Sequence, residues 1–123
     1  MSDAYREVLS RLSRVPGVRG ALIALADAGV PVAEELQPDV AGDAIAALAA
    51  ALFRRTALAA QSGDLGTLET VHLEAEQGHV HVAGAGDLIV VALIADDAQI
   101  GRARLELVRA ARAVREAAEA AAT

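Results

Sequence analysis

The sequence predicts an α+β domain in which helices sandwich a single five-stranded antiparallel sheet. Segments with the apolar period of helices alternate with β-branched, strand-like segments, in the order α-β-β-α-β-β-β-α. Short turns that contain Gly or Asp join successive strands, as in hairpins. No linker or low-complexity block divides the 123 residues, so we expect residues 1–123 to form one domain.

Composition excludes several classes of function. The formal net charge of −6 disfavours general binding to nucleic acids or anionic membranes, because both need a basic surface. All 11 basic residues are Arg and no Cys occurs, which removes lysine-based and thiol-based catalysis, disulfides and thiolate zinc sites. No uncharged stretch approaches the roughly 20 residues of a membrane span, and no signal peptide opens the chain. We therefore expect a cytoplasmic protein without cofactors.

The first elements are a short amphipathic helix and a hairpin. Residues 2–14 have one apolar face, formed by Tyr5, Val8, Leu9 and Leu12. Residues 18–26 and 30–36 are apolar runs around a turn in which Gly29 takes the position that needs a positive φ. Pro31 cannot donate a ladder hydrogen bond, so its strand should lie at a sheet edge or begin there.

The segment from Asp43 to Ser62 is helix-like and apolar on almost every side. Asp43 is its predicted N-cap. Its predicted core face consists of Ile45, Leu48, Ala49, Leu52, Phe53, Thr56 and Ala59. Its opposite face is covered by Ala46, Ala47, Ala50, Ala51 and Ala57. A helix that is apolar all round is normally buried on both sides, which favours contact with a second chain over an alanine-rich solvent face.

The next two strands form a hairpin with a predicted two-residue turn at 77–78. This register pairs Glu76 with His79 and Glu74 with His81. It also places the three histidines, which include His72, on one face of the sheet. That pattern resembles a metal-ligand set, but its spacing matches no dedicated zinc signature, so we interpret it as a solvated sheet face. Weak pH sensing is the alternative, because a facing carboxylate favours the imidazolium.

The chain ends with a buried strand and a long helix. Leu88 to Ala95 is a continuous apolar run typical of a central strand. Asp96 and Asp97 are predicted to cap the helix that follows. Its inward stripe consists of Ile100, Ala103, Leu107, Ala110, Ala111, Val114 and Ala118.

Two long stretches resemble the roadblock/dynein light-chain family, in particular its bacterial members that partner Ras-like GTPases in gliding motility. Residues 18–33 are similar to the family's opening strand, Asp/Gly turn and return strand. Residues 87–105 are similar to its central strand, acidic turn and final helix, with Gly101 at a characteristic position. The resemblance covers nearly the whole chain through the order and spacing of these motifs. Longin-like and profilin-like domains share a related architecture.

The resemblance implies a homodimer in which the second helix packs on its twofold mate. The third strand, Leu68 to Glu76, would pair edge to edge with its own copy to form a continuous sheet. The expected dimer interface consists of Ala47, Leu48, Ala51, Leu52, Leu68, Val71 and Leu73.

The resemblance also implies a non-catalytic regulator that binds a small Ras-like GTPase and controls its GTP hydrolysis by ordering the GTPase's own switch residues. Ala50, Arg54 and Arg55 are the expected partner-binding residues. The two arginines have a second interpretation, since cations late in a helix complement its dipole. The alternative function is a structural adaptor without effect on GTP turnover. An enzyme would need a convergent polar pocket that the sequence does not reveal.

Overall fold

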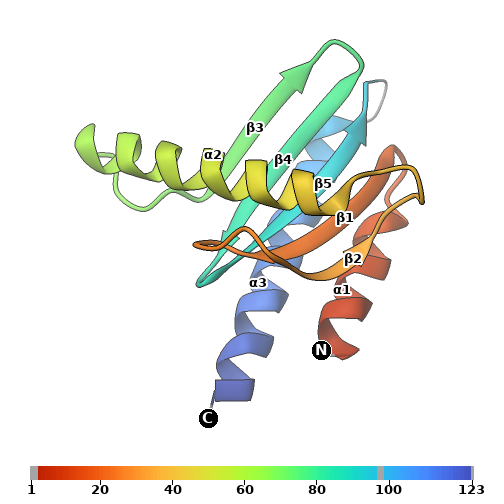
Figure 1. The fold of residues 1–123 in the computed structure, drawn as a ribbon, viewed down its shortest axis with the longest axis horizontal. Coiled ribbons are helices and arrows are strands. Elements are labelled where there is room, and N and C mark those ends of the chain that lie inside the picture. The colour runs from red at the N-terminus through yellow and green to blue at the C-terminus, as the bar shows by residue number, and fades with distance from the viewer. Residues whose placement is uncertain (1–2, 97–98, 123) are drawn as a thin grey trace.

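The computed structural model describes residues 3–96 and 99–122 of the chain (Figure 1). Its elements are α1 (Asp3–Ser13), β1 (Val18–Leu25), β2 (Pro31–Glu35), α2 (Gly42–Ser62), β3 (Thr70–Ala75), β4 (Gly78–Ala85), β5 (Leu88–Ala95) and α3 (Ile100–Ala122). This order and the single five-stranded sheet confirm the predicted fold class.

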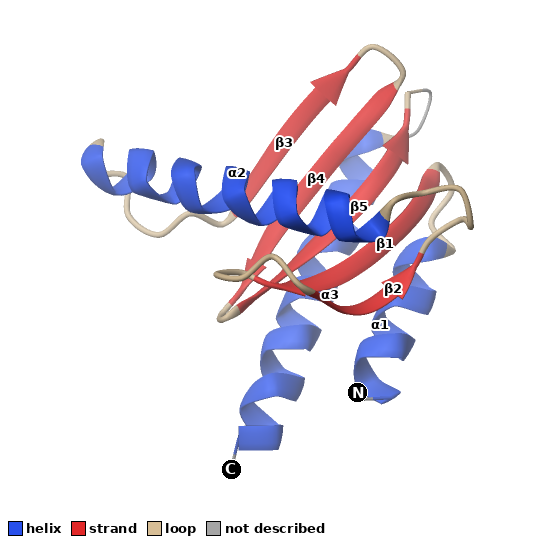
Figure 2. Cartoon of the chain, in the orientation of Figure 1, coloured by secondary structure: helices blue, strands red, loops and turns tan. Residues whose placement is uncertain are grey.

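The strands form one antiparallel sheet in the order β2-β1-β5-β4-β3, so β2 and β3 are its two edges (Figure 2). Pro31 is the first residue of β2, as predicted for a residue that cannot donate to a ladder. Gly29 adopts a φ of 68° in the preceding turn, which confirms its predicted role.

Helices cover both faces of the sheet. Helices α1 and α3 lie on one face and α2 crosses the other (Figure 1). Alternation along β1 supplies both cores, since Ala21 and Ile23 belong to the α1/α3 side and Leu22 and Ala24 to the α2 side. The predicted inward stripe of the last helix is confirmed, because all seven of its residues lie in or against the α1/α3 core.

The predicted register of the β3–β4 hairpin is wrong by two residues. Ala75 pairs with Gly78, so the turn residues are 76–77 and Gly78 begins β4. Gly78 is not among the described glycines with a positive φ. A Cβ atom there would instead lie 2.8 Å from the carbonyl oxygen of Ile94 on β5, so close approach between strands requires the glycine.

The predicted N-cap of α2, Asp43, is wrong by two residues. Helix α2 begins one residue before Asp43, and its N-cap residue, Ala41, makes no side-chain capping hydrogen bond. Asp43 therefore lies in the first turn, where its charge still suits the helix dipole. The cap predicted for the last helix involved Asp97, which lies outside the described residues.

Candidate interaction surface

The face of α2 that packs on the sheet is built from small residues. Gly42, Ala46, Ala49 and Ala50 are buried there, and Ile45 and Phe53 pack against the same core. The predicted core face is therefore wrong for Leu48, which is 71% exposed, and for Ala59, which is also exposed. The predicted opposite face is wrong for Ala46 and Ala50, which are buried in the core. The large side chains Leu22, Val82 and Ile89 of the sheet already fill this layer, so the helix contributes its smallest side chains and approaches closely.

The opposite face of α2 leaves apolar side chains in solvent. Leu48 and Leu58 are exposed by 71% and 64%, Ala47 is exposed, and Ala51 and Leu52 are half-buried. Four of these five residues belong to the interface expected from the sequence, which leaves out Leu58. An apolar strip of this kind along a 21-residue helix is the usual mark of an interaction site.

Edge strand β3 has apolar side chains on the face that α2 covers. Val71 is half-buried and packs against the α2 core, and Leu73 is 45% exposed. Leu68, in the segment before the strand, is half-buried. The edge is six residues long and carries no proline, so its main-chain groups are available to another strand. The expected interface residues on α2 and β3 thus share one side of the molecule.

The three expected partner-binding residues have different positions. Ala50 has no exposed surface and is part of the α2 core, so the structure removes it from any partner-binding surface. Arg54 is exposed, but its Nη1 atom donates hydrogen bonds of 2.8 Å to the carbonyl oxygens of Ala26 and Asp27. Arg55 is exposed on the next position of the helix. The pairing of Arg54 with a distant turn has no sequence signal, because it depends on how α2 crosses the sheet.

The histidines form a cluster on the face that α1 and α3 cover, and the interpretation as a solvated sheet face is wrong for His79 and His81, whereas His72 is exposed. His81 and His79 are buried, with 2% and 7% exposure. The actual register pairs His72 with His81 and Glu74 with His79. The ring centroids of His72 and His81 are 3.9 Å apart, and His72 Nε2 and His79 Nδ1 share a hydrogen bond of 2.9 Å.

The environment of His81 opposes its charged form. Burial is the main cause, and the nearby charges of His72, His79 and Arg104 add to it, so that the pKa of His81 falls from 6.5 to about 4. The prediction that a facing carboxylate would favour the imidazolium is therefore wrong for His81. Within residues 3–96 and 99–122, its Nε2 atom has no hydrogen-bond partner.

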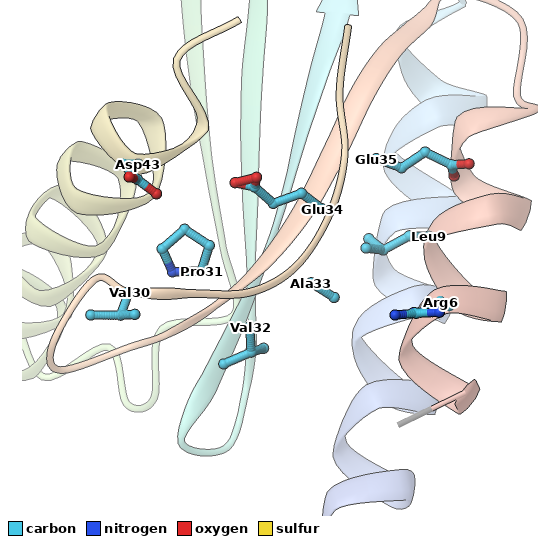
Figure 3. Close-up of a pocket in the computed structure, with 9 residues that line it drawn as sticks. All are labelled: Arg6, Leu9, Val30, Pro31, Val32, Ala33, Glu34, Glu35 and Asp43. Carbon is cyan, nitrogen blue, oxygen red and sulfur yellow. The ribbon is translucent and has the colours of Figure 1, made fainter. Parts of the chain in front are cut away.

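A groove runs along the other edge of the sheet, at β2 (Figure 3). Its volume is about 620 Å³. Val30, Pro31, Val32, Ala33 and Leu9 supply its apolar lining, and Glu34, Glu35, Asp43 and Arg6 its charges. Figure 3 shows the carboxylate of Glu34 pointing toward α2 and that of Glu35 pointing toward α1. Sequence reasoning missed this groove because its lining comes from three elements.

Within residues 3–96 and 99–122, no group of three or more His, Asp or Glu side chains has a geometry suited to a metal ion. No helix in the same ranges is long and apolar enough to cross a bilayer.

Comparison with known proteins places this architecture in a family. The Roadblock/LC7 domain family matches residues 4–95, which is most of the chain. The protein MJ1340 of Methanocaldococcus jannaschii is 30% identical over 108 residues, which cover 88% of this chain and 94% of MJ1340. This chain therefore belongs to the Roadblock/LC7 family.

Solved structures of the family have the same fold. A Roadblock/LC7 domain from Streptomyces avermitilis is 26% identical, with a TM-score of 0.83 over 92% of this chain and 96% of that domain. A structure of MglB with a tetrameric arrangement is 25% identical, with a TM-score of 0.85 over 98% of this chain and 94% of that one. The resemblance seen in residues 18–33 and 87–105 is thus confirmed at the level of the family.

Proposed function

We propose that this protein is a homodimeric, non-catalytic regulator of a small Ras-like GTPase. The observation that carries the proposal is the apolar outer face of α2, where Leu48, in the N-terminal half of the helix, is 71% exposed. An exposed leucine beside small alanines allows two helix backbones to approach closely, which suits packing against a twofold mate.

The β3 edge supports the same dimer. In the proposed arrangement β3 pairs with its own copy, and Val71 and Leu73 continue the apolar surface of α2 across the joint. The interface then includes Ala47, Leu48, Ala51, Leu52, Leu68, Val71 and Leu73. Membership of the Roadblock/LC7 family and the likeness to a tetrameric MglB arrangement are consistent with self-association.

The GTPase would contact the dimer near the C-terminal half of α2. Arg55 offers an exposed guanidinium there, and Arg54 offers a second one that also holds the β1–β2 turn. Phosphoryl transfer depends mainly on positioning and electrostatics, so a surface that orders a flexible switch loop accelerates hydrolysis without donating a reacting group. The regulator therefore needs no active site of its own.

The test is affinity capture from lysate of the source organism with the purified protein as bait. Parallel lanes contain a non-hydrolysable GTP analogue or GDP, and mass spectrometry identifies the captured proteins. A small GTPase recovered only with the GTP analogue supports the proposal, since a regulator distinguishes the two nucleotide states. The hydrolysis rate of that GTPase is then measured with and without the protein.

The same experiment distinguishes a GTPase regulator from a structural adaptor. A structural adaptor retains its partner equally in both lanes and leaves GTP turnover unchanged. Equal recovery of a partner that is not a GTPase would overturn the regulator proposal in favour of that alternative.

A further inference from the structure

The two edges of the sheet differ in their chemistry. The β3 edge is bordered by the apolar surface described above, whereas the β2 edge lies in a groove with three carboxylates and one guanidinium. From this difference we infer that the β2 edge is a second interaction surface, which binds an extended, basic protein segment by strand addition.

The main chain of β2 provides the first component of the site. Strand β2 pairs with β1 on one side and is the terminal strand of the described sheet on the other. Alternate residues of an edge strand direct their N–H and C=O groups away from the sheet, where a peptide can pair with them. The five residues of β2 extend over about 17 Å, enough for a partner strand of similar length.

Apolar side chains provide the second component. Val30 is 51% exposed, and the half-buried Pro31 and Val32 extend this apolar surface along the groove, above the buried side chains of Ala33 and Leu9. Carboxylates alone would suffice to protect a sheet edge from aggregation. Protection does not require the apolar lining beside these carboxylates. Such a lining suits peptide binding, because every second side chain of an added strand would be buried against it.

The charged side chains of the groove favour a basic segment as its binding partner. Glu34 and Asp43 border the groove on the α2 side, and Glu35 extends toward α1, where Arg6 is the one cationic side chain of the lining (Figure 3). A second copy of this chain would bring carboxylates against carboxylates, which is unfavourable for paired strands. A segment with Lys or Arg at alternating positions would place cations opposite these carboxylates and its intervening apolar side chains on the apolar lining.

The site is independent of the proposed GTPase surface. Dimerisation through β3 would leave both β2 edges unpaired at the two ends of the continuous sheet. The inference therefore predicts one bound segment per chain, in a dimer or in a monomer, and it can be tested without any GTPase.

The experiment uses the full chain and three fluorescein-labelled heptapeptides. The first alternates lysine and valine, the second replaces lysine by glutamate, and the third keeps the lysines but replaces the central valine by proline. Fluorescence anisotropy measures affinity, and amide hydrogen exchange locates the bound peptide. The lysine peptide should bind one per chain and protect amides within residues 32–35, since Pro31 has no amide hydrogen.

The two control peptides separate charge from strand pairing. The glutamate peptide should bind about tenfold more weakly, because it loses charge pairs that each contribute a few tenths to one kcal/mol. The proline peptide keeps its charge but loses a main-chain donor, so it should also bind more weakly. If the proline peptide binds as tightly as the lysine peptide, charge attraction alone explains the binding, and strand addition is overturned.

Variants of the protein complete the test. Glu35→Gln and Asp43→Asn should each weaken binding of the lysine peptide by about threefold. Glu116→Gln removes an exposed carboxylate of α3 that does not line the groove, and should leave the affinity unchanged. Failure of the lysine peptide to bind, or binding without protection of amides within residues 32–35, would refute the inference.

Discussion

Arg54 donates a hydrogen bond of 2.8 Å from its Nη1 atom to the main-chain carbonyl oxygen of Asp27. The same nitrogen donates to the carbonyl of Ala26, so one side chain of α2 holds the turn between β1 and β2. Backbone carbonyls in a tight turn have few other partners besides water, and a guanidinium can satisfy two of them with one planar group. Arg54 thus links the layer formed by α2 to the edge hairpin.

Replacement of Arg54 by Ala should destabilise the protein. Loss of the two exposed hydrogen bonds is expected to lower the free energy of unfolding by about 1 kcal/mol. Arg55→Ala is the matched control, since it removes the same type of side chain from the adjacent exposed position and should change stability by less than about 0.5 kcal/mol. Urea denaturation at pH 7.5 measures both. Equal effects of the two substitutions would show that the turn does not depend on Arg54.

Gly29 in the same turn is expected to be intolerant of a side chain for two reasons. Its φ of 68° is unfavourable for Ala, and a Cβ atom would lie 2.9 Å from the Cα of Ala47 on α2. Gly66 offers a matched control, because it has a φ of 86° but nothing within 4 Å of an added Cβ.

The two glycine substitutions therefore separate backbone strain from packing. Gly66→Ala should cost about 1–2 kcal/mol through its conformation alone. Gly29→Ala should exceed that by about 1 kcal/mol or more, since α2 must shift to make room. Thermal and urea denaturation provide the measurement. A similar decrease in the free energy of unfolding in both variants would mean that α2 shifts at little cost to accommodate the added Cβ atom.

The helix α2 shows where reasoning from sequence succeeds and where it fails. Its position, its length and its apolar character on all sides were predictable from residues 43–62. Its rotation was not, because a helix without a polar side gives a weak signal for the buried face. The prediction assigned the largest residues, including Leu48, to the core face. The sheet instead leaves room only for small residues such as Ala46 and Ala50.

The predicted register of the β3–β4 hairpin was wrong for a different reason. The dipeptide at 77–78 has the composition of a tight turn, so the sequence favoured a turn there. The glycine is required instead by its contact with the carbonyl of Ile94, which is a long-range feature. A shift of two residues preserves which face each side chain occupies, so the grouping of the three histidines was predicted although their partners were not.

Acid should destabilise the fold through His81. The pKa of this group is about 4 in the folded protein and near 6.5 when it is unfolded, because burial disfavours the imidazolium. Between these values the unfolded chain binds more protons, so stability falls as the pH decreases from about 6.5 to 4. This group is expected to lower the free energy of unfolding by about 3 kcal/mol over that range. Above pH 6.5 its contribution is fully present.

The variant His81→Leu tests this assignment. It removes the buried imidazole and its unpartnered Nε2 atom, so the free energy of unfolding should depend less on pH between 6.5 and 4. Urea titrations at pH 7.5, 6.0 and 5.0 compare the variant with the unchanged protein. An identical pH dependence in both would assign the acid sensitivity to other groups.

Leu48→Glu should prevent self-association without unfolding the chain. Leu48 is 71% exposed and contributes little to the core of its own chain, so far-UV circular dichroism should not change. In the proposed dimer the carboxylate would be buried against the apolar side chains of the twofold mate, which costs desolvation free energy. Leu65→Glu is the matched control, since Leu65 is 79% exposed in the loop after α2 and lies outside the proposed interface. Multi-angle light scattering at micromolar concentration should give a dimer for the unchanged protein and the control, and a monomer for Leu48→Glu. A monomeric unchanged protein, or a dimeric Leu48→Glu variant, would contradict the proposed packing of α2.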